Sequence, residues 1–101
     1  MTITLIATMS IREGMMEDAI EALKVGVPKV KANEPGLLEY IPHTVTGKGN
    51  ENFIKFYEVY EDQEALKIHG ENQRKTDFMH AFGRCVDRNV KVDLTYCNKI
   101  L

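Results

Sequence analysis

The segment FIKFYEVYEDQEALKIH, residues 53–69, joins a strand pattern to the start of a helix. Its residues 53–60 are rich in aromatic and β-branched side chains, which favour a strand. Asp62 follows at the position of a helix N-cap, and the predicted short helix runs on to His69. The pattern also places the carboxylate of Glu58 among aromatic residues, where a buried charge needs a partner.

The rest of the chain adds three strands and two helices to this unit. Strand character covers residues 3–11, 37–45 and 90–96, and a hairpin loop is expected over 46–52. Helical periodicity covers residues 16–33 and 78–86. Pro28 predicts a kink or a weakened last turn in the first of these helices, and Pro42 predicts an edge position or a bulge. Gly70–Asn72 is expected to interrupt the helix that begins after Asp62.

The order β-α-β-β-α-β predicts an α+β fold of the ferredoxin-like kind, an antiparallel sheet with helices on one face. Such a sheet leaves its second face open. Residues 37–45 and 53–60 carry large apolar side chains in both phases, for example Phe56 and Tyr57. Because burying one such side chain contributes roughly 1.5–3 kcal/mol, we expect a second copy to cover the open face and form a homodimer.

Composition narrows the class of protein. A chain of 101 residues with 44% hydrophobic residues is expected to form a single domain, residues 1–101. Its net charge of −2 and lack of a basic run give no reason to expect nucleic acid or a membrane surface as partner. The two cysteines and the absence of a signal-peptide pattern predict a cytoplasmic protein.

Two motifs connect the sequence to a known family. EPGLLEY, residues 34–40, and YEVYEDQEAL, residues 57–66, followed by His69, resemble the antibiotic biosynthesis monooxygenase family. The resemblance implies a dimeric α/β barrel in which two sheets pack face to face, with a pocket between each sheet and its helices. Two positions depart from the family pattern. Tyr60 stands where tryptophan is most frequent, and Arg74 lies near the place of a second histidine.

The resemblance also implies a reaction class. Members include cofactor-independent monooxygenases that act on quinols, anthrones and other polycyclic phenols, while others degrade haem or isomerise small phosphorylated sugars. The absence of any tryptophan argues against the haem-degrading branch. We therefore expect a small aromatic or quinol-type substrate, O2 and no cofactor. The sequence has no glycine-rich phosphate loop and no histidines at metal-ligand spacing, so we expect no metal.

A cofactor-free oxygenase needs a base, hydrogen-bond donors and apolar walls. His69 is the candidate base, because imidazole titrates near neutral pH. Its alternative role is structural, as a hydrogen-bond partner of Glu58 or of a backbone carbonyl. Glu58 is the second candidate catalytic residue, and its alternative is a paired core carboxylate. The candidate substrate-binding residues are Tyr40, Phe56, Tyr57, Tyr60, Arg74 and His80.

Each of these assignments has a simpler alternative. Tyrosines in a half-buried sheet are usually core or interface residues, and His80 and Arg74 are typical of a helix surface and an exposed loop. The main hypothesis is a cofactor-independent monooxygenase of a quinol or other phenol. The alternatives are a non-catalytic, ligand-binding barrel with a role in stress, or an isomerase of a small carbonyl compound in which His69 moves a proton.

Overall fold

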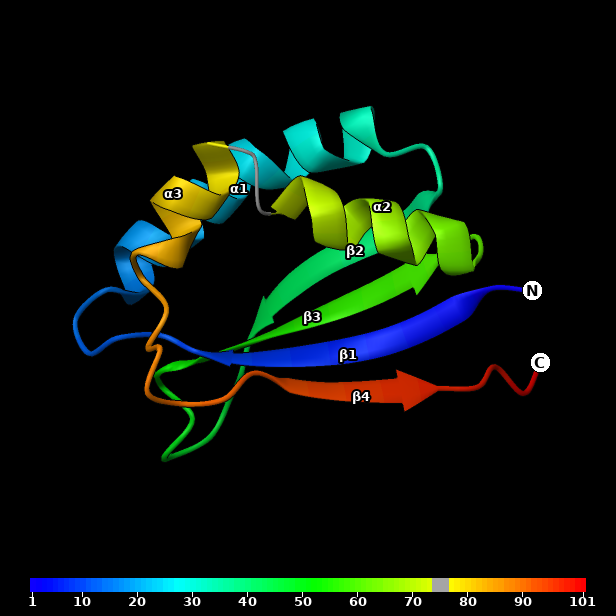
Figure 1. Cartoon of the computed structure of the whole chain (residues 1–101). Helices are drawn as coiled ribbons and strands as arrows, with labels where there is room; N and C mark the ends of the chain where they lie inside the picture. The colour runs from blue at the N-terminus through cyan, green and yellow to red at the C-terminus, as the bar shows by residue number, and fades with distance from the viewer. Residues whose placement is uncertain (74–76) are drawn as a thin grey trace.

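The computed structural model describes residues 1–73 and 77–101, which form four strands and three helices. The elements are β1 (Ile3–Ser10), α1 (Met16–Asn33), β2 (Leu37–Thr44), β3 (Phe53–Tyr60), α2 (Gln63–Gln73), α3 (Asp77–Gly83) and β4 (Asp93–Cys97). The helices lie on one face of the sheet (Figure 1). This arrangement confirms the ferredoxin-like fold, and the two helical segments predicted between β3 and β4 are α2 and α3.

The four strands form one antiparallel sheet in the order β2-β3-β1-β4. β3 pairs with β1 along its whole length, from Phe53 opposite Ser10 to Tyr60 opposite Ile3. The strand that the sequence predicts most strongly therefore lies at the centre. β2 is an edge strand, which agrees with the position of Pro42.

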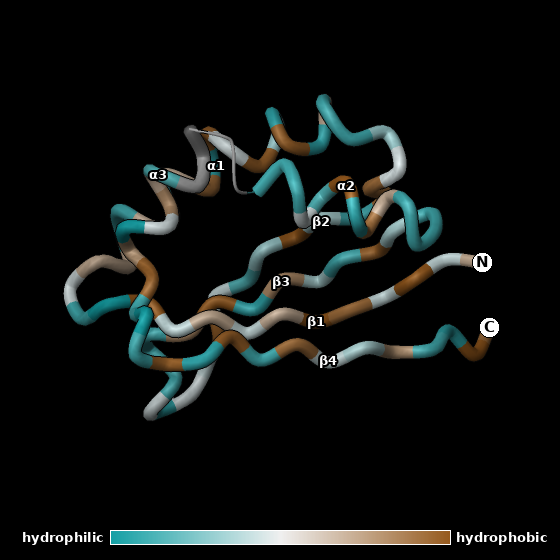
Figure 2. The backbone as a smooth tube through the Cα atoms, in the orientation of Figure 1, coloured by the Kyte–Doolittle hydropathy of each residue, from teal (hydrophilic) through white to brown (hydrophobic). Residues whose placement is uncertain are grey.

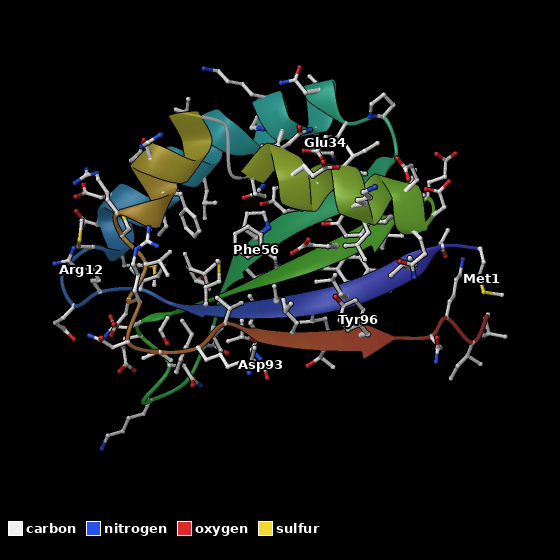
Figure 3. All side chains as sticks on the ribbon, viewed as in Figure 1. Met1, Arg12, Glu34, Phe56, Asp93 and Tyr96 are labelled. Carbon is white, nitrogen blue, oxygen red and sulfur yellow. The ribbon has the colours of Figure 1, made fainter. Side chains whose placement is uncertain are left out.

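Alternation along β3 separates the two faces of the sheet. Its buried residues are Ile54, Phe56, Glu58 and Tyr60, and they face the helices. Hydrophobic and hydrophilic segments alternate along this strand in Figure 2. Figure 3 shows Phe56 in the layer between the sheet and the helices. The core thus lies between β3 and its neighbours on one side and α1, α2 and α3 on the other.

A bulge changes the alternation in β2. The register shifts between Leu37 and Glu39, and both Leu37 and Tyr40 are buried while Leu38 is 45% exposed. A strict period of two over residues 37–45 predicts that Leu38 shares a face with Tyr40 and Leu37 with Ile41, and the bulge shows that this prediction is wrong. An extra residue in one strand reverses the phase of the residues that follow it.

The second face of the sheet is open in the single chain. Ile41 and Tyr57 are paired across β2 and β3 on this face, and each is 40% exposed. Leu94 and Tyr96 are opposite Ala7 and Leu5, on the helix side of β4, yet they are 51% and 59% exposed. Burial of both faces within one chain is thus not observed, and their coverage by a second copy stays a prediction.

The helix boundaries confirm some expectations and correct others. The Oδ1 atom of Asp62 accepts a hydrogen bond from the backbone N–H of Ala65 at 2.9 Å, so Asp62 caps α2 as predicted. The predicted interruption at Gly70 is wrong, because α2 continues to Gln73. A single glycine costs a helix only about 1 kcal/mol, which tertiary contacts can offset. α1 contains Pro28 and ends at Asn33, as predicted. In the described part of the chain, no helix is long and apolar enough to span a bilayer.

Candidate active site

Five side chains from four parts of the chain meet beneath α2. They are Glu34, which follows α1, Tyr40 of β2, Glu58 and Tyr60 of β3, and His69 of α2. We call these five residues the buried cluster, since none of them is more than 8% exposed. Polar side chains so deeply buried need hydrogen-bond partners, and the cluster supplies most of them internally.

His69 is held by a carboxylate. Its Nδ1 atom lies 2.9 Å from Oε1 of Glu34, while its Nε2 atom lies 3.9 Å from Oε1 of Glu58. The first distance is a hydrogen bond and the second exceeds one. An ionised carboxylate can only accept, so an ionised Glu34 requires the ring proton to be on Nδ1. In the neutral ring, the lone pair is then on Nε2, on the side of Glu58.

Glu58 lies in an environment that favours its neutral form. Burial raises the pKa of Glu58, while the hydrogen bond from Tyr60 and the proximity of His69 act in the opposite direction. The hydroxyl of Tyr60 donates this hydrogen bond to Oε1 of Glu58. A carboxyl group with a raised pKa can hold or release a proton closer to neutral pH than a solvated one.

Both tyrosines of the cluster remain neutral at physiological pH. Burial raises the pKa of Tyr40, and the charge of Glu58 adds to the effect. Burial and the same charge also raise the pKa of Tyr60. A neutral tyrosine hydroxyl has one proton to donate, and Tyr60 already donates its proton to Glu58, so Tyr40 is the tyrosine of the cluster whose proton is left for an anion.

The walls of the cluster are aromatic. The ring of His69 meets Tyr40 and Tyr60 edge-on, with centroid distances of 5.1 Å and 5.4 Å. Phe56 stacks on Tyr40 at 5.3 Å and meets Phe82 edge-on at 5.8 Å. Aromatic rings on several sides exclude water and strengthen the electrostatic interactions inside.

A close contact at Gly36 positions Glu34 beneath His69. A Cβ atom added to Gly36 would lie 2.7 Å from Cβ of Ala65 in α2, so only glycine allows this approach. The carbonyl of Gly36 also accepts a hydrogen bond from the backbone N–H of Glu61 at 2.8 Å. These contacts hold the Glu-Pro-Gly turn against the start of α2.

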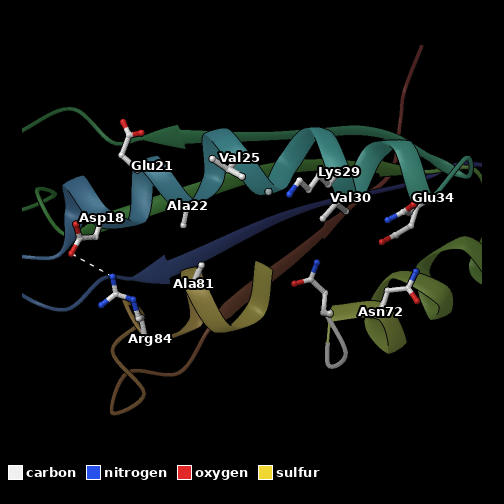
Figure 4. A pocket seen from close by; sticks show the side chains of 13 residues that line it. Asp18, Glu21, Ala22, Val25, Lys29, Val30, Glu34, Asn72, Ala81 and Arg84 are labelled. Atoms are coloured by element: carbon white, nitrogen blue, oxygen red, sulfur yellow. Dashed lines mark ion pairs between the residues drawn. The ribbon is translucent and has the colours of Figure 1, made fainter. Parts of the chain in front are cut away.

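A cleft of about 540 Å³ opens beside the cluster, between α1, α2 and α3 (Figure 4). Among the described residues, its apolar wall includes Val25 and Val30, and its polar end includes Glu34 and Asn72. Glu34 therefore belongs both to the buried cluster and to the cleft. Its Oε1 atom binds His69, whereas Oε2 has no hydrogen-bond partner among the residues that the structure describes. A buried oxygen without a partner costs about 1–3 kcal/mol, unless a ligand or water supplies a donor.

The structure brings together four of the predicted site residues and separates others. His69, Glu58, Tyr40 and Tyr60 are in the cluster, with Phe56 stacked on its edge. None of these five lines the cleft in the described part of the chain.

The remaining predicted residues lie elsewhere. Tyr57 is on the open face of the sheet, and His80 is exposed on α3. Arg74 lies outside the described residues. Within those residues, no group of three or more His, Cys, Asp or Glu side chains is arranged to hold a metal ion.

Sequence reasoning missed Glu34 as a site residue. The signal was its place as the first residue of the Glu-Pro-Gly motif, since a carboxylate next to a turn that packs on a helix is easily drawn into the core. Its partner is 35 positions away, and no local pattern indicates that contact.

Comparison with known proteins supports the resemblance. The sequence pattern named "Antibiotic biosynthesis monooxygenase" matches residues 2–81. A structure from Caulobacter crescentus CB15, named "putative antibiotic biosynthesis monooxygenase", is 27% identical and covers 99% of this chain and 91% of its own, with a TM-score of 0.76. No curated protein sequence matches the chain.

Two further structures share the fold. PA3566 from Pseudomonas aeruginosa is 24% identical, covering 99% of this chain and 95% of its own, with a TM-score of 0.72. Rv0793 from Mycobacterium tuberculosis is 17% identical, covering 99% and 96%, with a TM-score of 0.74. The pattern match over residues 2–81 spans most of the sequence, and the chain therefore belongs to the antibiotic biosynthesis monooxygenase family.

Proposed function

We propose that this protein is a cofactor-independent monooxygenase that oxidises a quinol or another small phenol with O2. The observation that carries the proposal is a buried histidine fixed by a carboxylate at 2.9 Å within an aromatic enclosure. Family membership supports the reaction class. For a hydroquinone, one oxygen atom enters the ring and the other leaves as water, giving a hydroxyquinone. The substrate supplies the electrons.

Removal of the phenolic proton is the step that the protein's own side chains would perform. A phenolate is more electron-rich than the neutral phenol, so it reduces O2 more readily. In this proposal His69 is the base, and the Glu34 carboxylate orients its ring and stabilises the imidazolium that forms. Glu58 lies 3.9 Å from Nε2 and accepts the hydrogen bond of Tyr60. The neutral hydroxyl of Tyr40 is the donor available to the anion.

We also propose that the protein is a homodimer whose sheets pack face to face. The support is the open face of the sheet, where the paired residues Ile41 and Tyr57 are both 40% exposed and Ile6 lies next to Tyr57. If the same surface of a second copy covers this apolar centre, both chains bury their exposed side chains at once.

We propose a cytoplasmic location as well. Two free cysteines, Cys85 and Cys97, suit a reducing compartment and support this location.

The test is incubation of the purified protein with a panel of quinols, with and without O2. Formation of a hydroxyquinone that requires both protein and O2 supports the proposal. Tight binding without turnover indicates the ligand-binding alternative, and conversion that does not need O2 indicates the isomerase. Either of these outcomes overturns the monooxygenase assignment.

Variants of His69 separate its two roles. His69→Asn places an amide N–H near the position of Nδ1, so it can still donate to Glu34, but it has no basic nitrogen. We expect a folded protein with oxidation reduced about 10²- to 10⁴-fold. His43→Ala, at an exposed histidine whose Nδ1 contacts only the nearby carbonyl of Ile41 among described residues, is the control. Unchanged oxidation in folded His69→Asn would exclude His69 as the base.

A further inference from the structure

The cleft between α1, α2 and α3 has two chemically different ends. Asp18 and Arg84 form an ion pair at 3.8 Å at one end, and Glu34 and Asn72 lie at the other. Figure 4 shows Val30 of α1 pointing into the space between these ends. Together with Val25 and Ala22, it gives the middle of the cleft an apolar wall.

This distribution fits a largely apolar molecule with a polar group at one end. The volume of about 540 Å³ lies within the range of small-molecule sites, roughly 300–1,000 Å³. The ion pair between Asp18 and Arg84 neutralises the distant end. The other two charged residues of the described lining besides Glu34 are Glu21 and Lys29, which have opposite charges. The cleft apart from Glu34 therefore carries no excess charge for an ionic ligand to seek. At the near end, an acceptor is available, because Oε2 of Glu34 has no partner among the described residues.

We propose that this cleft is the binding site for a hydroxylated aromatic molecule, and that Glu34 is the residue that receives its hydroxyl group. The inference rests on the proposed function for the substrate class, and it adds the place of binding and a residue that the sequence did not indicate. The ligand's ring lies against Val25 and Val30, and its O–H donates to Oε2 of Glu34. The other oxygen of this carboxylate accepts from Nδ1 of His69.

Glu34 is suited to this position because each oxygen has a separate task. A carboxylate offers about four acceptor sites, so binding His69 through Oε1 leaves Oε2 free for a ligand. The Glu34 side chain is only 5% exposed, and a hydrogen bond to a charged acceptor is stronger when water is excluded. In this pose Glu34 is the member of the buried cluster in direct contact with the ligand's hydroxyl, and His69 acts on it only through the Glu34 carboxylate.

Binding of 1-naphthol and of 1-methylnaphthalene to the unmodified protein tests the role of the hydroxyl. The two probes have nearly the same shape, but only the first can donate a hydrogen bond. We expect 1-naphthol to bind at least about tenfold more tightly, measured by calorimetry, and to shift the methyl NMR signals of Val25 and Val30. Equal affinities, or signals that do not shift, would overturn the proposal without any variant having to fold.

Two tryptophan variants on α1 test the place of binding. Val25→Trp fills the cleft, whereas Ala32→Trp adds the same side chain at an exposed position that does not line it. We expect at least about a tenfold loss of 1-naphthol affinity in Val25→Trp and none in Ala32→Trp. Glu34→Gln should weaken 1-naphthol and leave 1-methylnaphthalene unchanged.

The same variants separate this inference from the proposed reaction. If Val25→Trp oxidises a quinol at the normal rate, the site is wrong and the monooxygenase assignment stands. If 1-naphthol binds in the cleft but no quinol is oxidised, the reaction is wrong and the binding site stands.

Discussion

The contact between Gly36 and Ala65 gives a stability prediction in which two similar substitutions act in opposite directions. Gly36→Ala introduces a Cβ atom 2.7 Å from Cβ of Ala65, closer than two carbon atoms can pack. Neither atom is at the end of a flexible side chain, so the turn and α2 have to separate. Gly70→Ala is the matched control, because an added Cβ atom there has nothing within 4 Å.

The magnitude follows from these two environments. Overpacking of this kind costs about 1–3 kcal/mol, and for a chain of about this length each kcal/mol lowers the melting temperature by roughly 4–8 °C. Gly70 lies inside α2, where replacing glycine by alanine stabilises a helix by about 0.5–1 kcal/mol. We therefore expect Gly36→Ala to melt well below the unmodified protein and Gly70→Ala to melt slightly above it.

Urea unfolding at one fixed protein concentration measures both effects, and a double variant tests their cause. Ala65→Gly removes the methyl group that Gly36→Ala would strike, at a cost of about 1 kcal/mol for glycine in a helix. If the steric argument holds, the double variant loses about as much stability as Ala65→Gly alone. Losses that add within about 0.5 kcal/mol would show that the two positions do not interact, and a neutral Gly36→Ala would refute the reasoning directly.

Three further predictions concern the cap, the buried carboxyl group and the open face. Asp62→Ala should lower the free energy of unfolding by about 0.5–2 kcal/mol in urea, because it removes the hydrogen bond at the start of α2, and an unchanged midpoint would contradict this. Burial raises the pKa of Glu58, so its contribution to stability is present below its ordinary pKa of 4.5 and is lost as pH rises through the folded value. The free energy of unfolding of the unmodified protein should therefore fall, relative to that of Glu58→Gln, between pH 4.5 and pH 7. The expected fall is about 1.4 kcal/mol for each unit by which the pKa of Glu58 is raised. Stability profiles that run parallel over this pH range would contradict the prediction. Light scattering at micromolar concentration should show that the unmodified protein and Ile68→Glu are dimers and that Ile41→Glu is a monomer. The two isoleucines are similarly exposed, at 41% for Ile68 and 40% for Ile41, but only Ile41 lies on the open face of the sheet. A monomeric mass for the unmodified protein would exclude the dimer.

The sequence was most informative where local rules decide the structure. The aromatic and β-branched residues at 53–60 predicted β3 with its observed bounds, and the position of Asp62 predicted the start of α2. The bulge at Leu37 could not be predicted, because one inserted residue depends on how the edge strand packs and not on its own pattern. The continuation of α2 through Gly70 was missed for a similar reason, since tertiary contacts outweigh a weak local preference.

The candidate site shows the same division between local and distant information. Glu58 and Tyr60 were predicted to share a buried face, because both lie in one strand with a period of two. The hydrogen bond between Glu34 and His69 joins residues 35 positions apart and depends on the close approach of Gly36 to α2. A motif can indicate that such a turn matters, but the identity of the side chain that it buries against His69 requires the three-dimensional arrangement.

The structural role of His69 and its proposed catalytic role use different nitrogen atoms and are therefore compatible. Nδ1 binds Glu34 and so ties α2 to the residue that follows α1. Nε2 is 3.9 Å from Glu58 and makes no hydrogen bond within the described part of the chain, so its lone pair is not used by the fold. Loss of stability on removing the ring would consequently say nothing against catalysis. The chemistry depends on whether a ligand's hydroxyl reaches this cluster, and Glu34, which binds His69 through Oε1 and also lines the cleft, is the residue through which that access would occur.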